Sequence, residues 1–383
     1  MLQYRTVYVL LTFKKDVLTN GSTLNLREET FKKQRGGIEM KPRIRVIFIF
    51  AVLLVAFPFF PSFSGAVEPI KWTCVNSYPP GSNEMEINLP ILIKAIENET
   101  KGQIKIKLVP PGVLCPTKET MDGLAAGMFE MAVSSSWAKV PETNLGQFTF
   151  YSTREWTDVA VLYYDYGVLD WVRKAGQKSG AIMLTVNPGG PYSFLTNFRI
   201  TSLKDVKGKK IRTSQSAVQQ ALIRELGGMP TYLPGGEIYM GLKLGTVDGT
   251  VYSFAELESM KLKEVVKYVV IEPPLAPSVL SHNYVNEKAW NSLSPELRKA
   301  VDKASRDSLS GQRNKCSDDD AKAIKAAKEY GVKFITLPKS DLALFNAAKT
   351  RAMETVLKMY PECIEGYELI KKWLKKEKGE SKI

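Results

Sequence analysis

The chain has 383 residues, of which 44% are hydrophobic and 24% are charged, and its formal net charge is +13. These values describe a globular protein long enough for two domains, and they exclude a fibrous or a disordered chain. The charge raises the question of a nucleic-acid partner, but almost half of it lies in the first 66 residues. Elsewhere basic residues are interspersed with acidic ones except in the tail at 371–382, and no platform of aromatic and basic residues is visible. We therefore expect no nucleic-acid partner.

Residues 40–66 have the pattern of a secretory signal peptide. A basic segment at 41–45 precedes an apolar stretch, and the segment ends in Ser-Gly-Ala, which suits signal peptidase. The apolar stretch of about fifteen residues is interrupted by Pro58 and is short for a membrane span of roughly twenty. Cleavage is therefore favoured over an uncleaved anchor. We expect a periplasmic protein that does not itself span the membrane.

A signal peptide begins at the initiator methionine, yet residues 1–39 precede this one. We hypothesise that Met40 is the true start and that residues 1–39 are an extension created by a misplaced start codon.

Four cysteines, at positions 74, 115, 316 and 363, lie in the exported part of the chain. The periplasm permits disulfides, and four cysteines allow three full pairings between which the sequence does not choose. Their spacing is unlike that of a zinc site. We expect one or two disulfides, or buried thiols, and no metal.

The first half of the exported chain predicts a parallel sheet. Strands at 70–75, 103–109 and 131–134 alternate with two helices, which is a βαβαβ pattern. Ligands bind such sheets in loops at the carboxyl ends of strands. Tyr78, in the loop after the first strand, and Trp137, in the loop after the third, are therefore candidate ligand contacts. Interlobe packing is the equal alternative for Trp137.

A second lobe is predicted to follow. Aromatic residues at 156–177 indicate one long core helix, and residues 187–191 then break the chain where it crosses from one lobe to the other. A proline-rich return crossing follows a helix at 256–266 and a strand. Two crossings are what a hinge between discontinuous lobes requires.

Between the crossings, residues 208–252 predict strand, helix, strand, helix and strand. Arg212 lies at the carboxyl end of the first of these strands, where ligands bind. Ser214 is predicted to cap the following helix, and Gly227 to end it.

The chain then returns to the first lobe. A strand at 278–285 is predicted to rejoin the first sheet, and Ser294 and Pro295 begin a long helix. A separate helical run at 318–330, a strand at 332–337 and a helical ending capped by Ser340 complete the chain. The predicted fold is α/β and two-lobed, with these parts: lobe I at 67–187, lobe II at 188–277, the return to lobe I at 278–337, and C-terminal helices at 338–383.

Three motifs in this order resemble one known family. They are GKKIR at 208–212, GGEIYMGLKLG at 235–245 and TVDG at 246–249. Together they are similar to the solute-binding subunit of tripartite ATP-independent periplasmic (TRAP) transporters of the dicarboxylate-receptor (DctP) type. The resemblance extends from about 70 to 337. It implies a periplasmic-binding-protein fold and a partner made of small and large membrane subunits driven by an ion gradient.

The resemblance also implies roles for particular residues. In the family, the arginine of the first motif grips a ligand carboxylate, and this position is Arg212. Tyr252 stands where members place a ligand-facing asparagine or aromatic residue, and Tyr192 where some relatives carry a second arginine. Phe194 and Glu256 are further candidates, with a structural role as the alternative for each.

These residues indicate the kind of ligand. Aromatic lining at 137, 192 and 252 favours a monocarboxylate with an apolar, keto or hydroxy body over a heavily charged sugar acid. Some relatives bridge such a ligand with a metal ion, but residues 273–281 contain no Asp or Glu. This disfavours a metal ion, although Glu256 nearby keeps that alternative open, and we expect no cofactor.

Catalysis has little support in the sequence. His282 is the only histidine and falls in a predicted buried strand. No histidine is therefore available to activate a Ser or Cys nucleophile. No glycine pattern for phosphate binding occurs. We expect a solute receptor for a small organic carboxylate and not an enzyme. The alternatives are the binding protein of an ABC-type importer and a periplasmic enzyme acting on a carboxylate.

Overall fold

The computed structural model describes residues 68–379, with gaps at 136, 138, 145–155 and 277–279. All of the described residues belong to the unit Ala66–Ile383. The signal peptide and the extension before it lie outside the described residues, and the account below concerns this unit.

The first sheet has the strand order β2-β1-β3-β10-β4. β1 runs parallel to β2 and β3, as the βαβαβ pattern predicts, whereas β10 is antiparallel to both of its neighbours. The strands are β1 (Ile70–Asn76), β2 (Ile104–Val109), β3 (Met131–Ser134), β4 (Ala181–Pro188) and β10 (Leu280–Asn286). The helical segments around it are η1 (Glu84–Asn88), α2 (Leu89–Glu99), η2 (Thr117–Glu119), α3 (Thr120–Ala126), η3 (Pro141–Asn144), α5 (Trp156–Tyr164), α6 (Val168–Gln177) and α10 (Glu287–Asn291).

The second sheet has the strand order β11-β9-β5-β8-β6-β7. β6 runs parallel to β7 and β8, and β5 is antiparallel to β8 and β9. The strands are β5 (Tyr192–Thr196), β6 (Lys210–Thr213), β7 (Met229–Tyr232), β8 (Gly249–Ser253), β9 (Tyr268–Glu272) and β11 (Lys333–Thr336). The helical segments are η4 (Leu203–Val206), α7 (Ala217–Glu225), η5 (Gly235–Glu237), α8 (Ile238–Lys243), α9 (Glu256–Ser259) and η6 (Leu262–Glu264).

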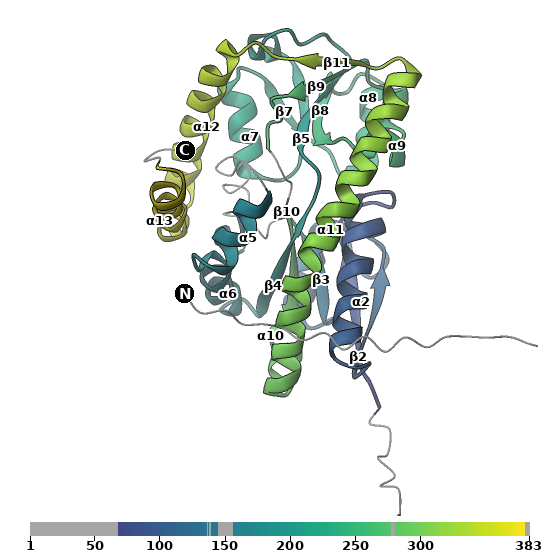
Figure 1. Cartoon of the computed structure of the whole chain (residues 1–383), viewed down its shortest axis with the longest axis vertical. Helices are drawn as coiled ribbons and strands as arrows, with labels where there is room; N and C mark the ends of the chain where they lie inside the picture. The colour runs from purple at the N-terminus through teal and green to yellow at the C-terminus, as the bar shows by residue number, and fades with distance from the viewer. Residues whose placement is uncertain (1–67, 136, 138, 145–155, 277–279, 380–383) are drawn as a thin grey trace, which may run out of the picture. The chain divides into compact units, whose positions relative to one another are not determined.

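The chain crosses between the sheets where the sequence predicts. β4 of the first sheet leads into β5 of the second, and β9 of the second leads back to β10 of the first (Figure 1). The two crossings lie side by side, because Tyr192 donates its backbone N–H to the carbonyl of Ala276 at 3.0 Å and Leu275 donates to the carbonyl of Tyr192 at 2.8 Å. Crossing segments joined in this way bend together.

A third connection is the helix α11 (Pro295–Tyr330), which is one helix of 36 residues and not the two runs predicted. As expected, Ser294 caps it, by accepting from the Leu297 N–H at 3.2 Å; Gly331 ends it at φ 106°. α11 contacts α2 and β4 at the first sheet and α9 at the second (Figure 1). It delivers β11 to the second sheet, beside β9, so this strand does not return to the first lobe as predicted. The lobe boundaries themselves remain predictions.

Two predicted helices are interrupted. Residues 156–177 form α5 and α6, because Gly167 between them has a left-handed φ of 80° that a right-handed helix cannot continue. Residues 256–266 form α9 and η6, and Lys261 between them has φ 57°.

Two predicted caps are also corrected. Ser216, not Ser214, caps α7. The C-terminal segments are α12 (Ser340–Met359), η7 (Pro361–Cys363), α13 (Ile364–Trp373) and η8 (Leu374–Lys378). Ser340 is the first residue inside α12, and no side chain caps the start of that helix.

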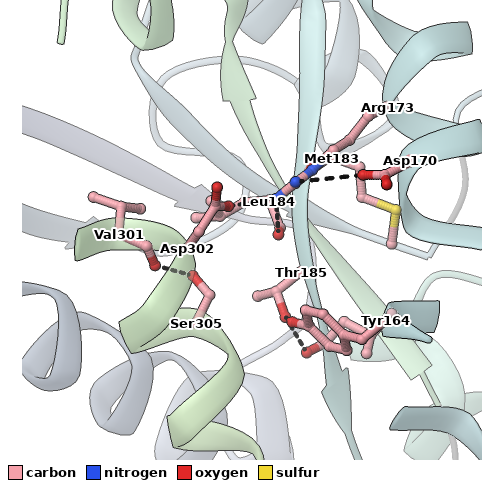
Figure 2. A network of polar contacts seen from close by, with 10 residues as sticks. Tyr164, Asp170, Arg173, Met183, Leu184, Thr185, Val301, Asp302 and Ser305 are labelled. Atoms are coloured by element: carbon pink, nitrogen blue, oxygen red, sulfur yellow. Dashed lines mark hydrogen bonds and ion pairs between the residues drawn. The ribbon is translucent and has the colours of Figure 1, made fainter. Parts of the chain in front are cut away.

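One arginine ties three elements of the first half together. Arg173 of α6 donates from Nε to the carbonyl of Met183 at 2.8 Å and from Nη2 to that of Leu184 at 3.0 Å, both on β4. The same Nη2 lies 2.5 Å from Oδ1 of Asp302 on α11. Figure 2 shows this network between α6, β4 and α11. The long helix is thereby fixed against the first sheet.

All four cysteines are free thiols. Cys74, Cys316 and Cys363 are buried, Cys115 is half-buried, and burial raises the pKa of Cys363 to about 12. The structure therefore realises the buried-thiol alternative. In the part of the chain that the structure describes, no helix is both long and apolar enough to cross a membrane.

Candidate functional site

A cavity of about 360 Å³ lies where the carboxyl ends of β1, β3 and β6 face one another. Its wall therefore comes from both sheets and from the crossing between them. The lining residues are Ser77, Tyr78, Pro79, Pro80, Pro111, Thr117, Lys118, Ser134 and Ser135 on one side, and Tyr192, Arg212, Ser214, Gln215, Gln219, Tyr232, Pro234, Gly235, Gly236, Glu237 and Tyr252 on the other.

Arg212 is the buried cation of this cavity. It lies on β6 and is only 5% exposed. Its Nε donates to the carbonyl of Leu233 at 3.0 Å, and its guanidinium carbon lies 5.4 Å from the centroid of the Tyr252 ring. These two contacts fix the plane of the guanidinium. The hydrogen bond holds its Nε and the Tyr252 ring covers one of its faces, so the planar group cannot rotate freely.

No carboxylate in the described part of the chain forms an ion pair with Arg212. Burial lowers the pKa of Arg212. A guanidinium stays charged in proteins, and an unpaired buried charge is costly. The cavity therefore presents a positive charge that an anion entering it would neutralise.

Aromatic rings form one wall beside Arg212. The rings of Tyr192 and Tyr252 stack with centroids 5.4 Å apart and planes 22° from parallel. Burial raises the pKa of Tyr78, Tyr192 and Tyr252, so each remains a neutral phenol. A neutral phenol offers an apolar face and one hydroxyl donor or acceptor, which suits the body of an organic acid.

Sequence reasoning missed Gln219, which lines the cavity from the first turn of α7 and is 4% exposed. Its Oε1 accepts from the backbone N–H of Ser214 at 2.7 Å and from the Ser214 hydroxyl at 3.1 Å. The signal available in the sequence was a glutamine at the third position of a helix that begins shortly after Arg212.

Three predicted ligand contacts do not line the cavity. Trp137 is buried and donates from Nε1 to Oδ1 of Asp122 on α3 at 3.0 Å, a contact within the first half of the chain that does not test the interlobe-packing alternative. Phe194 is fully buried in the core beneath the cavity wall. Glu256 is 2% exposed and accepts from the Ser253 hydroxyl and from the Asn83 N–H at 3.3 Å. The structure thus brings together Arg212, Tyr252, Tyr192 and Tyr78 of the seven residues predicted.

Glu256 belongs to a second feature that the sequence did not reveal, a buried group of carboxyls from η1, α9 and α11. Burial, and next the charge of Glu256, raise the pKa of Glu84 to about 8 and that of Asp320 to about 7. Asp320 accepts from the Ala255 N–H at 2.9 Å. In the described residues no group of three or more His, Cys, Asp or Glu is arranged to hold a metal ion.

The only histidine of the chain does not reach the cavity. His282 is 1% exposed on β10, and its Nε2 lies 3.2 Å from the Tyr163 hydroxyl. Burial lowers the pKa of His282 to about 4, so the ring is neutral at physiological pH.

The sequence model of the bacterial extracellular solute-binding proteins, family 7 (DctP), matches residues 76–359. This chain belongs to family 7. The match covers the cavity and every strand of both sheets except β1, of which it includes only Asn76, and it confirms the resemblance to DctP-type receptors. The family consists of solute-binding receptors and not of enzymes, and its members are extracytoplasmic.

Relatives and solved structures agree with this assignment. The 2,3-diketo-L-gulonate-binding periplasmic protein YiaO of Escherichia coli (strain K12) is 28% identical over 63% of this chain and 74% of its own length. A TRAP solute-binding protein from Roseobacter denitrificans, with bound β-D-glucuronate, matches at a TM-score of 0.68 and 22% identity over 78% of this chain and 98% of that chain. Another TRAP solute-binding protein, from Desulfovibrio salexigens with bound orotic acid, matches at a TM-score of 0.69 and 21% identity. That match covers 79% of this chain and 97% of that chain. The two-lobed α/β fold of these TRAP solute-binding proteins is the fold of this chain.

Proposed function

We propose that this protein is the periplasmic receptor of a TRAP transporter and that it binds a small organic monocarboxylate in the cavity around Arg212. The observation that carries the proposal is the buried Arg212 guanidinium without a carboxylate partner among the described residues. A bidentate carboxylate would complete its donors and neutralise its charge. The stacked rings of Tyr192 and Tyr252 would cover the apolar body of the ligand.

The ligands named for three of the related proteins support this class. Diketogulonate, glucuronate and orotate each carry one carboxyl group, and each also carries keto or hydroxyl oxygens or a ring. A cavity of about 360 Å³ is at the small end of the range for ligand pockets. Delivery to the small and large membrane subunits of the transporter is the role that this receptor would have.

The test is thermal unfolding of the periplasmic protein with a panel of acids. The panel contains simple monocarboxylates, keto and hydroxy acids, uronates, aromatic acids, dicarboxylates and amino acids. Ligand at 100 times its Kd adds about 2.7 kcal/mol to the free energy of unfolding, which raises Tm by a few degrees.

The variant Arg212→Met should lose the shift, and Arg224→Met should keep it, because Arg224 is exposed on α7 and does not line the cavity. No shift with any acid, or a shift that Arg212→Met leaves intact, would contradict the proposed ligand class or its anchor. Product formation during the incubation would favour an enzyme instead.

A further inference from the structure

The side-chain amide of Gln219 has one defined orientation. The backbone N–H of Ser214 can only donate, so the atom that faces it at 2.7 Å must be the amide oxygen. The Ser214 hydroxyl, at 3.1 Å, donates to the same oxygen. The amide nitrogen therefore points away from Ser214.

This nitrogen has no acceptor among the described residues. The nitrogen is not sealed from solvent. The residue that carries it is 4% exposed and lines the cavity. The small exposed part of Gln219 thus includes an amide donor that faces the cavity. A buried amide group is usually paired, so an acceptor on a bound molecule is the natural partner.

The amide lies on the same wall as the anion-binding group. Ser214, which holds Gln219, follows Arg212 by two residues at the carboxyl end of β6. A carboxylate on Arg212 would place the neighbouring carbons of the ligand beside this donor. An amide N–H donates to a keto or hydroxyl oxygen but has nothing to offer an alkyl group or an ammonium group.

A second carboxylate is disfavoured at this point, because Arg212 is the only buried cation lining the cavity in the described residues. Lys118, the other basic residue of the lining, is exposed. An uncharged oxygen needs no counter-ion, whereas a second buried carboxylate would need one.

We propose that Gln219 is a specificity-determining residue that selects acids carrying a keto or hydroxyl oxygen close to the carboxylate. This inference rests on the proposed function, since it assumes that a carboxylate occupies Arg212. A site built to donate to a ligand oxygen discriminates strongly against the analogue that lacks it.

The experiment compares acids that differ by one oxygen. Isothermal titration measures Kd for 2-oxobutanoate, 2-hydroxybutanoate and 3-hydroxybutanoate against butanoate, and for 3-phenyllactate against 3-phenylpropanoate, with the full-length periplasmic protein. The readout is the ratio of Kd values within each pair. A merely structural role of Gln219 would weaken both members of a pair equally and leave the ratio unchanged.

We expect the native protein to prefer the oxygenated acid at least tenfold in one of the pairs. Gln219→Leu should reduce that preference to about twofold or less. Gln219→Glu keeps an oxygen for Ser214 but replaces the donor by an acceptor, so it should also abolish the preference. Gln220→Leu is the matched control, because Gln220 donates to the Ser214 carbonyl at 3.2 Å and lies outside the cavity lining.

Two results would overturn the inference and leave the proposed function standing. They are an unchanged ratio in Gln219→Leu while binding still depends on Arg212, and a native protein that prefers the acid without the oxygen. Absence of binding by any acid, here and in the wider panel, would instead contradict the proposed function itself.

Discussion

The guanidinium of Arg212 lies over the ring of Tyr252, with 5.4 Å between the guanidinium carbon and the ring centroid. The ring covers one face of the cation, and the carbonyl of Leu233 accepts a hydrogen bond from its Nε. The terminal nitrogens are the donors that remain for a ligand. Tyr252 thus contributes to the cavity in two ways, as the support of the cation and as part of the aromatic wall.

The contribution of the Tyr252 ring can be separated from that of its hydroxyl. Tyr252→Leu removes the cation–π contact, which is worth about 0.5–2 kcal/mol, and should weaken binding of the best acid roughly twofold to thirtyfold. Tyr252→Phe keeps the ring and should stay within about twofold. Titration calorimetry at one pH measures both. Equal losses in the two variants would show that the hydroxyl, and not the ring, holds the ligand or the cation.

Stability should fall as the pH rises through neutrality, because buried carboxyls must ionise. Burial, followed by the charge of Glu256, raises the pKa of Glu84 from 4.5 to about 8. The folded state therefore holds this proton more tightly than the unfolded state does. The stabilisation is complete below about pH 4.5 and is lost as the pH approaches 8. Asp320, whose pKa is raised to about 7 mainly by burial, acts in the same direction.

Urea unfolding between pH 5 and pH 9 measures this decline. Glu84→Gln keeps the shape of the side chain without its ionisation, so the free energy of unfolding should depend less on pH. Glu119→Gln, on an exposed residue, should leave the dependence as in the native protein. If Glu84→Gln and the native protein have the same pH profile, the carboxyl of Glu84 is not the group that titrates.

The parts of the fold that could be predicted from sequence are those with local signals. Ser294 and Pro295 begin α11 and Gly331 ends it, because each acts through its own backbone or side chain. The carboxyl end of β6 identified the position of Arg212 in the same way. The pairing of β11 with β9 could not be predicted, since a four-residue strand has no local feature that selects one sheet over the other.

The site was predictable only where a motif or a strand end marked it. The buried carboxyls depend on contacts between distant segments, such as the bond from the Asn83 N–H to Glu256, which spans 173 residues. Gln219 depends on a local contact with Ser214, five residues away, that no sequence motif marks. The choice between two serines as the cap of α7 also depended on a side-chain contact. The Ser214 hydroxyl is held by Gln219, and Ser216 therefore caps the helix.

That cap provides a stability test. The Ser216 hydroxyl accepts from the Gln219 N–H at 3.2 Å and is fully buried. Ser216→Ala should lower the free energy of unfolding by about 1 kcal/mol, as for other N-cap serines. Ser340→Ala should change it far less, because no side chain caps α12. Urea unfolding of the two variants checks both, and a larger loss in Ser340→Ala would mean that the caps are assigned to the wrong serines.

The two glycines that begin η5 should respond differently to alanine, although both line the cavity. A Cβ on Gly235 would lie 2.8 Å from Cδ of Pro79, in the loop after β1 on the opposite wall. A Cβ on Gly236 would meet no atom within 4 Å. Since a proline ring cannot move aside as a flexible side chain does, Gly235→Ala should hold the two walls apart at this point.

We expect Gly235→Ala to weaken binding of the best acid about tenfold, because the ligand would no longer be enclosed from both sides. Stability without ligand should change little, because the substitution affects only the contact between the walls and not the core of either sheet. Gly236→Ala should bind as the native protein does. Calorimetric Kd values and Tm without ligand, measured for the three proteins, separate the two effects. Native affinity in Gly235→Ala would mean that binding does not require the close approach of Pro79 and Gly235. The tyrosine wall and Arg212 would then hold the ligand from one side alone.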